Sequence, residues 1–188
     1  MGASTPEQVE NLIRMGFHEA AGWDAGSLEA SAGRPDEPGG ILVVSELFLG
    51  IAKQCELMGI DNRLTIAMME AHENISVVPQ KYFYWCYGID DGRAMIDLSP
   101  GKAIGQLADA GRFPAVTALV LAIFREDLHV ISGNHRIDVG GSRIEKDLIP
   151  TLQIGNGCAR DHRPILSSTR LASVGKPTYG MASYLRAK

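Results

Sequence analysis

The chain has 188 residues, of which 45% are apolar and 21% are charged, and its net charge is −4. This composition predicts one globular domain and excludes a disordered chain, and the acidic balance gives no reason to expect broad binding to nucleic acid or membranes. The three cysteines, Cys55, Cys86 and Cys158, lie far apart, which favours reduced thiols in a cytoplasmic protein. No apolar run is long enough to span a bilayer, and the first 20 residues lack the apolar region of a secretory signal.

The first segment predicts a helix. Thr5-Pro6-Glu7 has the residues of a helix start, and Val9, Leu12, Ile13 and Phe17 recur at helical spacing. The sequence "SAGRPDEPGG" at 31–40 is rich in proline and glycine and predicts a linker. We therefore expect a helical arm at 1–30, a linker at 31–40 and one α+β domain at 41–188.

The next elements are expected to be two helices and a hairpin. Residues 41–57 show a mostly helical pattern ending near Gly59, although "ILVV" at 41–44 could be a short strand, and Asp61 could cap a second helix. Residues 75–98 are rich in β-branched and aromatic residues around the turn sequence "DDG", which predicts a β-hairpin. Its clustered aromatics must point to both faces of a strand; they are Tyr82, Phe83, Tyr84, Trp85 and Tyr87.

The second half of the chain predicts one more helix and several strands. Ser99-Pro100 opens a helix that Gly111 closes. The apolar runs "AVTALVLAIF" (115–124) and "LHVIS" (128–132) predict strands, and "DLIPTLQIG" (147–155) predicts another, with Pro150 at an edge position or a bulge. The expected fold is α+β, with N-terminal helices followed by a small mixed or antiparallel sheet and a packed helix.

The sequence Ser132-Gly133-Asn134-His135-Arg136 is the strongest candidate for a binding site. Glycine lets the backbone turn sharply and approach a ligand, and the exposed amides can bind an anion. Arg136 offers a guanidinium fork for two phosphate oxygens, Asn134 an amide, and His135 an acid or base for catalysis. Together these groups suit a nucleotide phosphate. The alternative is a simple polar turn in which Arg136 pairs with Asp138 or Glu145.

Residues elsewhere could assist this site. Lys102 lies near the predicted start of a helix, an end that favours anions. Arg143, with Gly140 and Gly141, could form a second anion-binding loop. Mg²⁺ is expected with a nucleoside triphosphate, and a carboxylate could come from three residues: Asp97, Glu126 or Asp127.

Residues 103–137 resemble the core of the ParB/sulfiredoxin superfamily. In that pattern a helix ends in a glycine (here Gly111), a proline (Pro114) leads into a strand, and a second strand ends in a glycine-x-His-Arg signature. The signature here is Gly133-Asn134-His135-Arg136, followed by "DVGGSR" where the superfamily has a helix. Members include nucleotide-dependent DNA clamps, nucleases, a free-serine kinase and a sulfinic acid reductase. The resemblance implies a phosphate-binding role for the signature, while its lack of cysteine gives no support to reductase chemistry.

Three functions are compatible with the sequence. One is a nucleotide (phosphate)-binding protein, with phosphoryl transfer or nucleotide hydrolysis if it is an enzyme, a question that the sequence leaves open. The second is a non-catalytic, oligomeric α+β assembly module, in which the aromatic hairpin and the N-terminal arm contact other subunits. The third, ranked last, is an enzyme with Cys86 or Cys158 as nucleophile.

Overall fold

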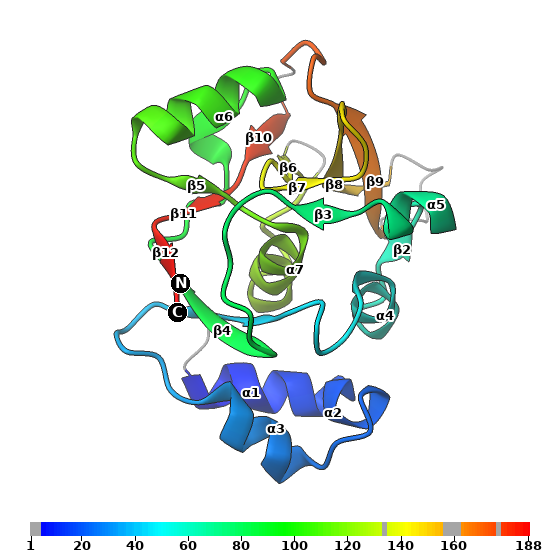
Figure 1. Ribbon diagram of the computed structural model, residues 1–188, viewed down its shortest axis with the longest axis vertical. Coiled ribbons are helices and arrows are strands. Elements are labelled where there is room, and N and C mark those ends of the chain that lie inside the picture. Colours follow the sequence, from blue (N-terminus) through cyan, green and yellow to red (C-terminus); the bar gives the residue numbers. More distant parts are fainter. Residues whose placement is uncertain (1–4, 133–134, 156–162, 176–177) are drawn as a thin grey trace.

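A computed structural model describes residues 5–132, 135–155, 163–175 and 178–188 and shows an α+β fold (Figure 1). Seven α-helices lie in this part of the chain: α1 (Thr5–Arg14), α2 (Phe17–Ala20), α3 (Ala25–Ala32), α4 (Ile51–Leu57), α5 (Ile66–Glu70), α6 (Pro100–Asp109) and α7 (Thr117–Glu126). A 3₁₀ helix, η1, covers Arg93–Met95. None of the described helices is both long and apolar enough to cross a membrane.

The strands form two larger sheets and two short pairs. The three-stranded sheet has the order β1-β4-β12, with β1 (Ile41–Val44), β4 (Phe83–Tyr87) and β12 (Arg186–Ala187). The five-stranded sheet has the order β10-β6-β8-β9-β2, with β10 (Tyr179–Met181), β6 (Arg136–Asp138), β8 (Leu148–Ile154), β9 (Pro164–Arg170) and β2 (Asp61–Asn62). The short pairs join β11 (Ser183–Tyr184) to β5 (Phe113–Pro114) and β3 (Glu73–Asn74) to β7 (Ser142–Arg143).

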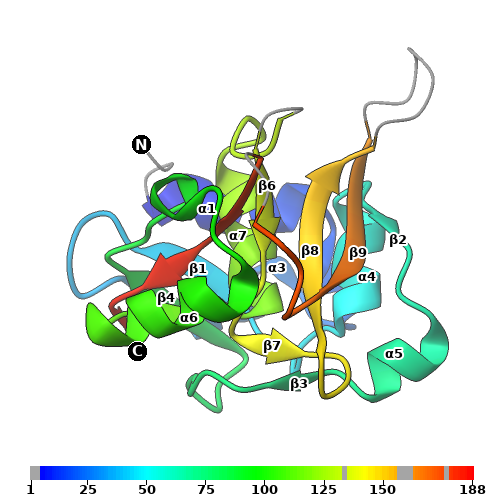
Figure 2. The ribbon, with the colours of Figure 1, turned by 90° about the horizontal axis from the view of Figure 1, so that it is seen from above.

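The five-stranded sheet is mixed. The β10–β6 and β2–β9 pairs are parallel, whereas β6–β8 and β8–β9 are antiparallel. Figure 2 shows β8 and β9 side by side as the longest strands. The predicted α+β class, with N-terminal helices and a mixed sheet, is confirmed.

Helix α7 forms the centre of the protein, between the two sheets (Figures 1 and 2). All but the last of its residues are buried, in one core with Val43 and Tyr84 of the small sheet and Ile137 and Leu152 of the large one. The prediction of a strand at 115–124 is therefore wrong. A helix that is apolar on every side belongs in a core, and periodicity alone cannot distinguish such a run from a buried strand.

Residues 5–32 pack against the rest of the chain. Val9, Leu12, Phe17 and Leu28 share a second core with the aromatic residues of β4 that face away from α7. The Gln8 side chain completes this contact at the edge of β1, because it accepts from the Leu42 amide (2.8 Å) and donates to the Gly40 carbonyl (2.9 Å).

The aromatic segment forms one strand with two packed faces. Tyr84 points into the α7 core, while Phe83, Trp85 and Tyr87 point into the second core. The expected alternation is confirmed. The predicted hairpin at 75–98 is wrong, because β4 pairs with β1 and β12 while Arg93–Met95 forms η1.

Other local predictions divide between confirmed and wrong. The helix from Pro100, the early helix from Thr5 and the strand at 148–154 are confirmed, and Gly59 and Gly111 follow helix ends with φ of 66° each. Residues 128–132 form a turn and a bridge rather than a strand. Residues 41–57 begin with strand β1 before α4, and α5 is capped by Thr65, not Asp61.

Pro150 lies in an inner strand, contrary to the expected edge position or bulge. Its carbonyl accepts from the Val139 amide at 2.9 Å, just beyond the end of β6. The missing proline amide would have faced the Val139 carbonyl, which accepts instead from Ser142 at 3.3 Å. The ladder therefore tolerates proline here because the neighbouring strand turns away.

Candidate functional site

One row of side chains crosses the five-stranded sheet and forms the base of a groove. The row has one residue from each strand: Tyr179, Arg136, Gln153, Ile165 and Asp61. The β6–β8 ladder pairs Ile137 with Leu152, so the next residues outward, Arg136 and Gln153, also face each other. Because neighbours in register point to the same side of a sheet, these five side chains share one face. The opposite face carries Ile137, Leu152 and Leu166 into the α7 core.

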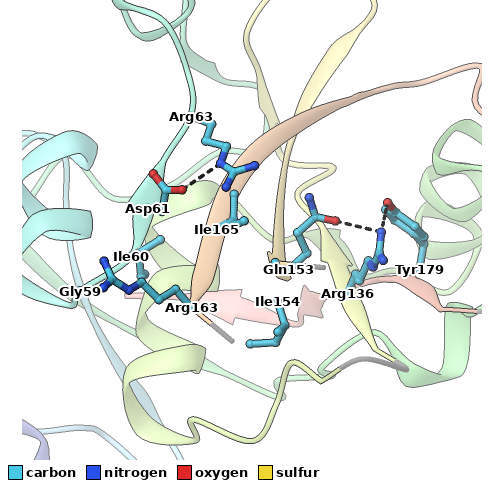
Figure 3. Close-up of a pocket in the computed structure, with 11 residues that line it drawn as sticks. Gly59, Ile60, Asp61, Arg63, Arg136, Gln153, Ile154, Arg163, Ile165 and Tyr179 are labelled. Atoms are coloured by element: carbon cyan, nitrogen blue, oxygen red, sulfur yellow. Dashed lines mark hydrogen bonds and ion pairs between the residues drawn. The ribbon is translucent and has the colours of Figure 1, made fainter. Parts of the chain in front are cut away.

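We name this groove the arginine groove; its volume is about 800 Å³ (Figure 3). The remaining described residues that line it are Gly59, Ile60, Arg63, Ile154, Gly155 and Arg163. Arg163, which immediately precedes β9, belongs to the same face as Ile165 two positions further on. Among the described residues, three arginines and one aspartate line the groove.

Arg136 is held in place by one of its guanidinium nitrogens. Nη1 donates to Gln153 Oε1 at 2.9 Å and to the Tyr179 hydroxyl at 2.6 Å, and the guanidinium carbon lies 4.9 Å from the centre of the Tyr179 ring. Within the described residues, Nε and Nη2 of Arg136 have no hydrogen-bond partner. A fixed guanidinium with two unused donor nitrogens is suited to a bidentate contact with an oxyanion.

Arg63 lies on the far side of the groove. Its Nε donates to Asp61 Oδ2 at 2.8 Å, an exposed pair. Figure 3 shows this pair separated from Gln153 and Arg136 by Ile165. The described arginines of the groove are therefore spread across the sheet rather than gathered at one point.

The sequence-predicted site residues do not all meet at this groove. Arg136 lines it, whereas Gly133 and Asn134 lie outside the described residues. His135, next to Arg136 along the chain, is 4% exposed and is absent from the groove lining. Its Nε2 donates to the Asp91 carbonyl at 3.0 Å, and its buried Nδ1 has no partner in the described part of the chain. His135 therefore anchors the turn at Asp91, and its ring is not positioned to act on a ligand of Arg136.

Lys102 and Arg143 are also remote from the groove lining. Lys102 is exposed on α6. Arg143 donates through Nη1 to the carbonyls of Gly140 (2.9 Å) and Ser142 (3.0 Å). Partial burial lowers the pKa of Arg143, and the charge of Glu73 opposes that shift. The glycines beside it have a packing role, since a Cβ on Gly141 would lie 2.3 Å from the Pro114 oxygen.

The three carboxylates expected to help with Mg²⁺ are not gathered. Glu126 pairs with Arg125 at 2.7 Å in a buried ion pair, and Asp127 accepts from the His129 amide at 2.9 Å. Asp97 lies in the loop before α6, with a φ of 71°. Across the described ranges, no three His, Cys, Asp or Glu side chains are grouped to hold a metal ion.

Two features missed by the sequence analysis involve residues far apart in the chain. The groove residues Gln153, Arg163, Arg63 and Tyr179 gave no local signal, because strand pairing alone brings them to Arg136. The second feature is a closed polar ring beneath β3, in which four hydrogen bonds and the contact of His72 Nδ1 with Glu46 Oε2 join five residues: Glu46, His72, Thr117, Ser142 and Asn74.

Cysteine chemistry has no support in the described part of the chain. Cys55 and Cys86 are fully buried, and burial raises the pKa of both thiols, that of Cys55 to about 12. A buried neutral thiol is a poor nucleophile, so the suggested role for Cys86 is wrong. Cys158 lies outside the described residues.

The fold and groove define an α+β protein with an arginine-lined groove on the polar face of its larger sheet. A family model described as "Family of unknown function (DUF5701)" matches residues 11–176. The match covers most of the chain, and the protein belongs to this family. Searches of curated proteins and of solved structures each found no match. The resemblance to the ParB/sulfiredoxin superfamily stays a prediction, and α7 occupies the place of the first strand that it implied.

Proposed function

We propose that the protein binds a phosphate-bearing small molecule of the nucleotide class in the arginine groove, with Arg136 as the principal phosphate ligand. The observation that carries the proposal is the state of Arg136, which Gln153 and Tyr179 hold while two of its nitrogens stay unpartnered among the described residues. Such a guanidinium loses little freedom on binding, which favours affinity. The excess of arginine over aspartate favours an anion over a neutral ligand.

The proposal concerns binding first. Phosphoryl transfer or nucleotide hydrolysis would need a group that accepts a proton from the attacking oxygen. Asp61 is the sole carboxylate among the described lining residues, and it is engaged with Arg63. Mg²⁺ would enter with a nucleoside triphosphate, whose phosphate oxygens provide most of its ligands.

The alternative of an assembly module has less support. Four of the five clustered aromatics, Phe83, Tyr84, Trp85 and Tyr87, are buried within the chain, with the N-terminal helices on one side of them, whereas Tyr82 is 48% exposed. Binding of small anions is therefore the function that the geometry supports best.

A thermal-shift assay tests the proposal. Nucleoside mono-, di- and triphosphates and inorganic phosphate are added with and without Mg²⁺, each to the wild type, Arg136→Gln and Lys102→Gln. A ligand at one hundred times its Kd stabilises the folded state by about 2.7 kcal/mol, which raises Tm by roughly 5–10 °C for a protein of this size. We expect the shift to disappear in Arg136→Gln and to persist in Lys102→Gln.

Two controls make the result decisive. Circular dichroism of Arg136→Gln must show a folded protein, and Arg136→Lys should retain part of the shift because it keeps the charge without the fork. If no anion shifts the wild type, or if Arg136→Gln responds fully, the proposal is wrong.

A further inference from the structure

We infer that Gln153 determines the specificity of the arginine groove. Its amide is a neutral acceptor that fixes the guanidinium of Arg136 without cancelling the positive charge, and it thereby reserves one edge of that guanidinium for an oxyanion with two neighbouring oxygens. The inference rests on the proposed function and adds to it the positioning residue and the shape of the anionic group that binds.

The described contacts of Arg136 use one of its nitrogens only. Nη1 donates to Gln153 Oε1 at 2.9 Å and to the Tyr179 hydroxyl at 2.6 Å, and Figure 3 shows both hydrogen bonds meeting at this atom. A terminal guanidinium nitrogen carries two hydrogens, so Nη1 has none left to donate. Nε and Nη2 share the other edge of the group, where parallel N–H bonds can receive two oxygens of one phosphate.

The direction of the Gln153 amide is fixed by its two neighbours. Arginine can only donate, so the amide oxygen must face Arg136 and the amide nitrogen must face away from it. The nitrogen, Nε2, donates to the Ser167 hydroxyl on β9 at 3.1 Å. Strand β8, which carries Gln153, lies between β6 and β9, so both ends of the amide are held within the sheet. Arg136 is therefore oriented before a ligand arrives, which lowers the entropy lost on binding.

The two groups that hold Arg136 are an amide and a phenol, and both are uncharged. Within the described ranges Arg136 forms no ion pair. Asp138, two residues along β6, is 3% exposed, accepts from the Thr151 hydroxyl at 3.0 Å and lies outside the groove lining. A carboxylate in place of the Gln153 amide would also hold Nη1, but its negative charge would repel an incoming anion.

Two substitutions distinguish a neutral positioning residue from a merely structural one. Gln153→Glu keeps an acceptor of the same shape and adds a charge, so the Tm without ligand should be unchanged or higher. Gln153→Leu removes the acceptor and leaves the charge of Arg136 unopposed, so the Tm without ligand should fall. For a structural role alone, the glutamate variant would bind anions better than the leucine variant. We expect the opposite order.

Sulfate, methyl sulfate and adenosine monophosphate are titrated into the wild type and the variants at about pH 8, where carboxylates are ionised, and binding is followed by the NMR shifts of backbone amides. Gln153→Glu should weaken sulfate binding at least about tenfold, because a negative charge then lies beside the bound anion. Gln153→Leu should weaken it roughly two- to fivefold, through lost preorganisation.

The charge of the ligand provides a second measurement. Coulomb energy is proportional to charge, so the logarithm of the Gln153→Glu loss should be about half as large for monoanionic methyl sulfate as for dianionic sulfate. Gln106→Glu is the matched control. It adds the same charge at an exposed position of α6 outside the groove lining, and it should change each affinity less than about twofold.

The outcomes separate this inference from the proposed function. If Gln153→Glu binds sulfate as tightly as the wild type, or more tightly than Gln153→Leu, the inference is wrong, while the proposed function stands provided that Arg136→Gln abolishes binding. Equal losses for sulfate and methyl sulfate would also overturn the inference, because the loss would not be electrostatic. If neither sulfate nor adenosine monophosphate binds the wild type, the proposed function fails and the inference fails with it.

Discussion

Replacing His72 with alanine should cost about 3 kcal/mol of unfolding free energy. The His72 side chain is 2% exposed; its Nδ1 lies 3.2 Å from Glu46 Oε2 and its Nε2 lies 2.8 Å from Thr117 Oγ1. The Glu46 carboxylate can only accept, whereas the Thr117 hydroxyl can donate or accept. Alanine removes the polar contact with the carboxylate, about 1.5–3 kcal/mol by analogy with hydrogen bonds to charged groups, and the hydrogen bond with Thr117, about 0.5–1.5 kcal/mol.

Urea unfolding measures this free energy. The midpoint of the transition and the slope of the free energy against urea concentration are fitted separately, because a changed slope reports a change in the compactness of the unfolded or folded state. Thr117→Val deletes only the neutral hydrogen bond at nearly constant volume and should cost about 1 kcal/mol. In His72→Ala/Thr117→Val the shared bond is lost only once, so the double variant should be less destabilised than the sum by about 0.5–1.5 kcal/mol. His129→Ala, at an exposed position, controls for loss of a histidine. A loss below about 1 kcal/mol for His72→Ala, or strict additivity with Thr117→Val, would refute a stabilising role for this polar ring.

Two further predictions concern burial and close packing. Burial raises the pKa of Cys55 to about 12 from an ordinary value of 9.0, so the unfolded chain loses this proton first and stability should fall as pH rises from about 9 to about 12. Across this pH range the Tm of Cys55→Ala should fall less steeply than the Tm of the wild type. The same dependence of Tm on pH in both proteins would contradict the raised pKa of Cys55. Gly180→Ala places a Cβ 2.1 Å from the Gly92 oxygen and should cost at least about 2 kcal/mol in urea unfolding, whereas an equal substitution at the open Gly105 should cost little.

The sequence predicted elements well where the signals were local. The start of α1, the N1 proline of α6 and the glycines after α4 and α6 depend on neighbouring residues only, and each was confirmed. Helix α7 was missed because it is surrounded by other elements, so its sequence shows no polar face. The aromatic strand β4 was recognised, but its partners were not, since they lie about 40 residues before it and 100 residues after it along the chain.

The same distinction explains the candidate site. Arg136 was identified because glycine, asparagine, histidine and arginine are adjacent in the sequence, but adjacency placed His135 on the wrong side of the strand. Side chains alternate between the faces of a strand, so consecutive residues cannot both face one groove unless the strand is broken. Proximity along the chain thus argued for a grouping that strand geometry forbids.

Three strand pairings would have been enough to find the groove: Arg136 with Gln153, Gln153 with Ile165, and Ile165 with Asp61. Once Arg136 is placed opposite Gln153, the two-residue period fixes the face of every residue on β8 and, through Ile165, on β9 and β2. Arg163 then falls on the same face and Arg170 on the other. Which arginines can act on one ligand is therefore decided by parity and register, which no stretch of neighbouring residues displays.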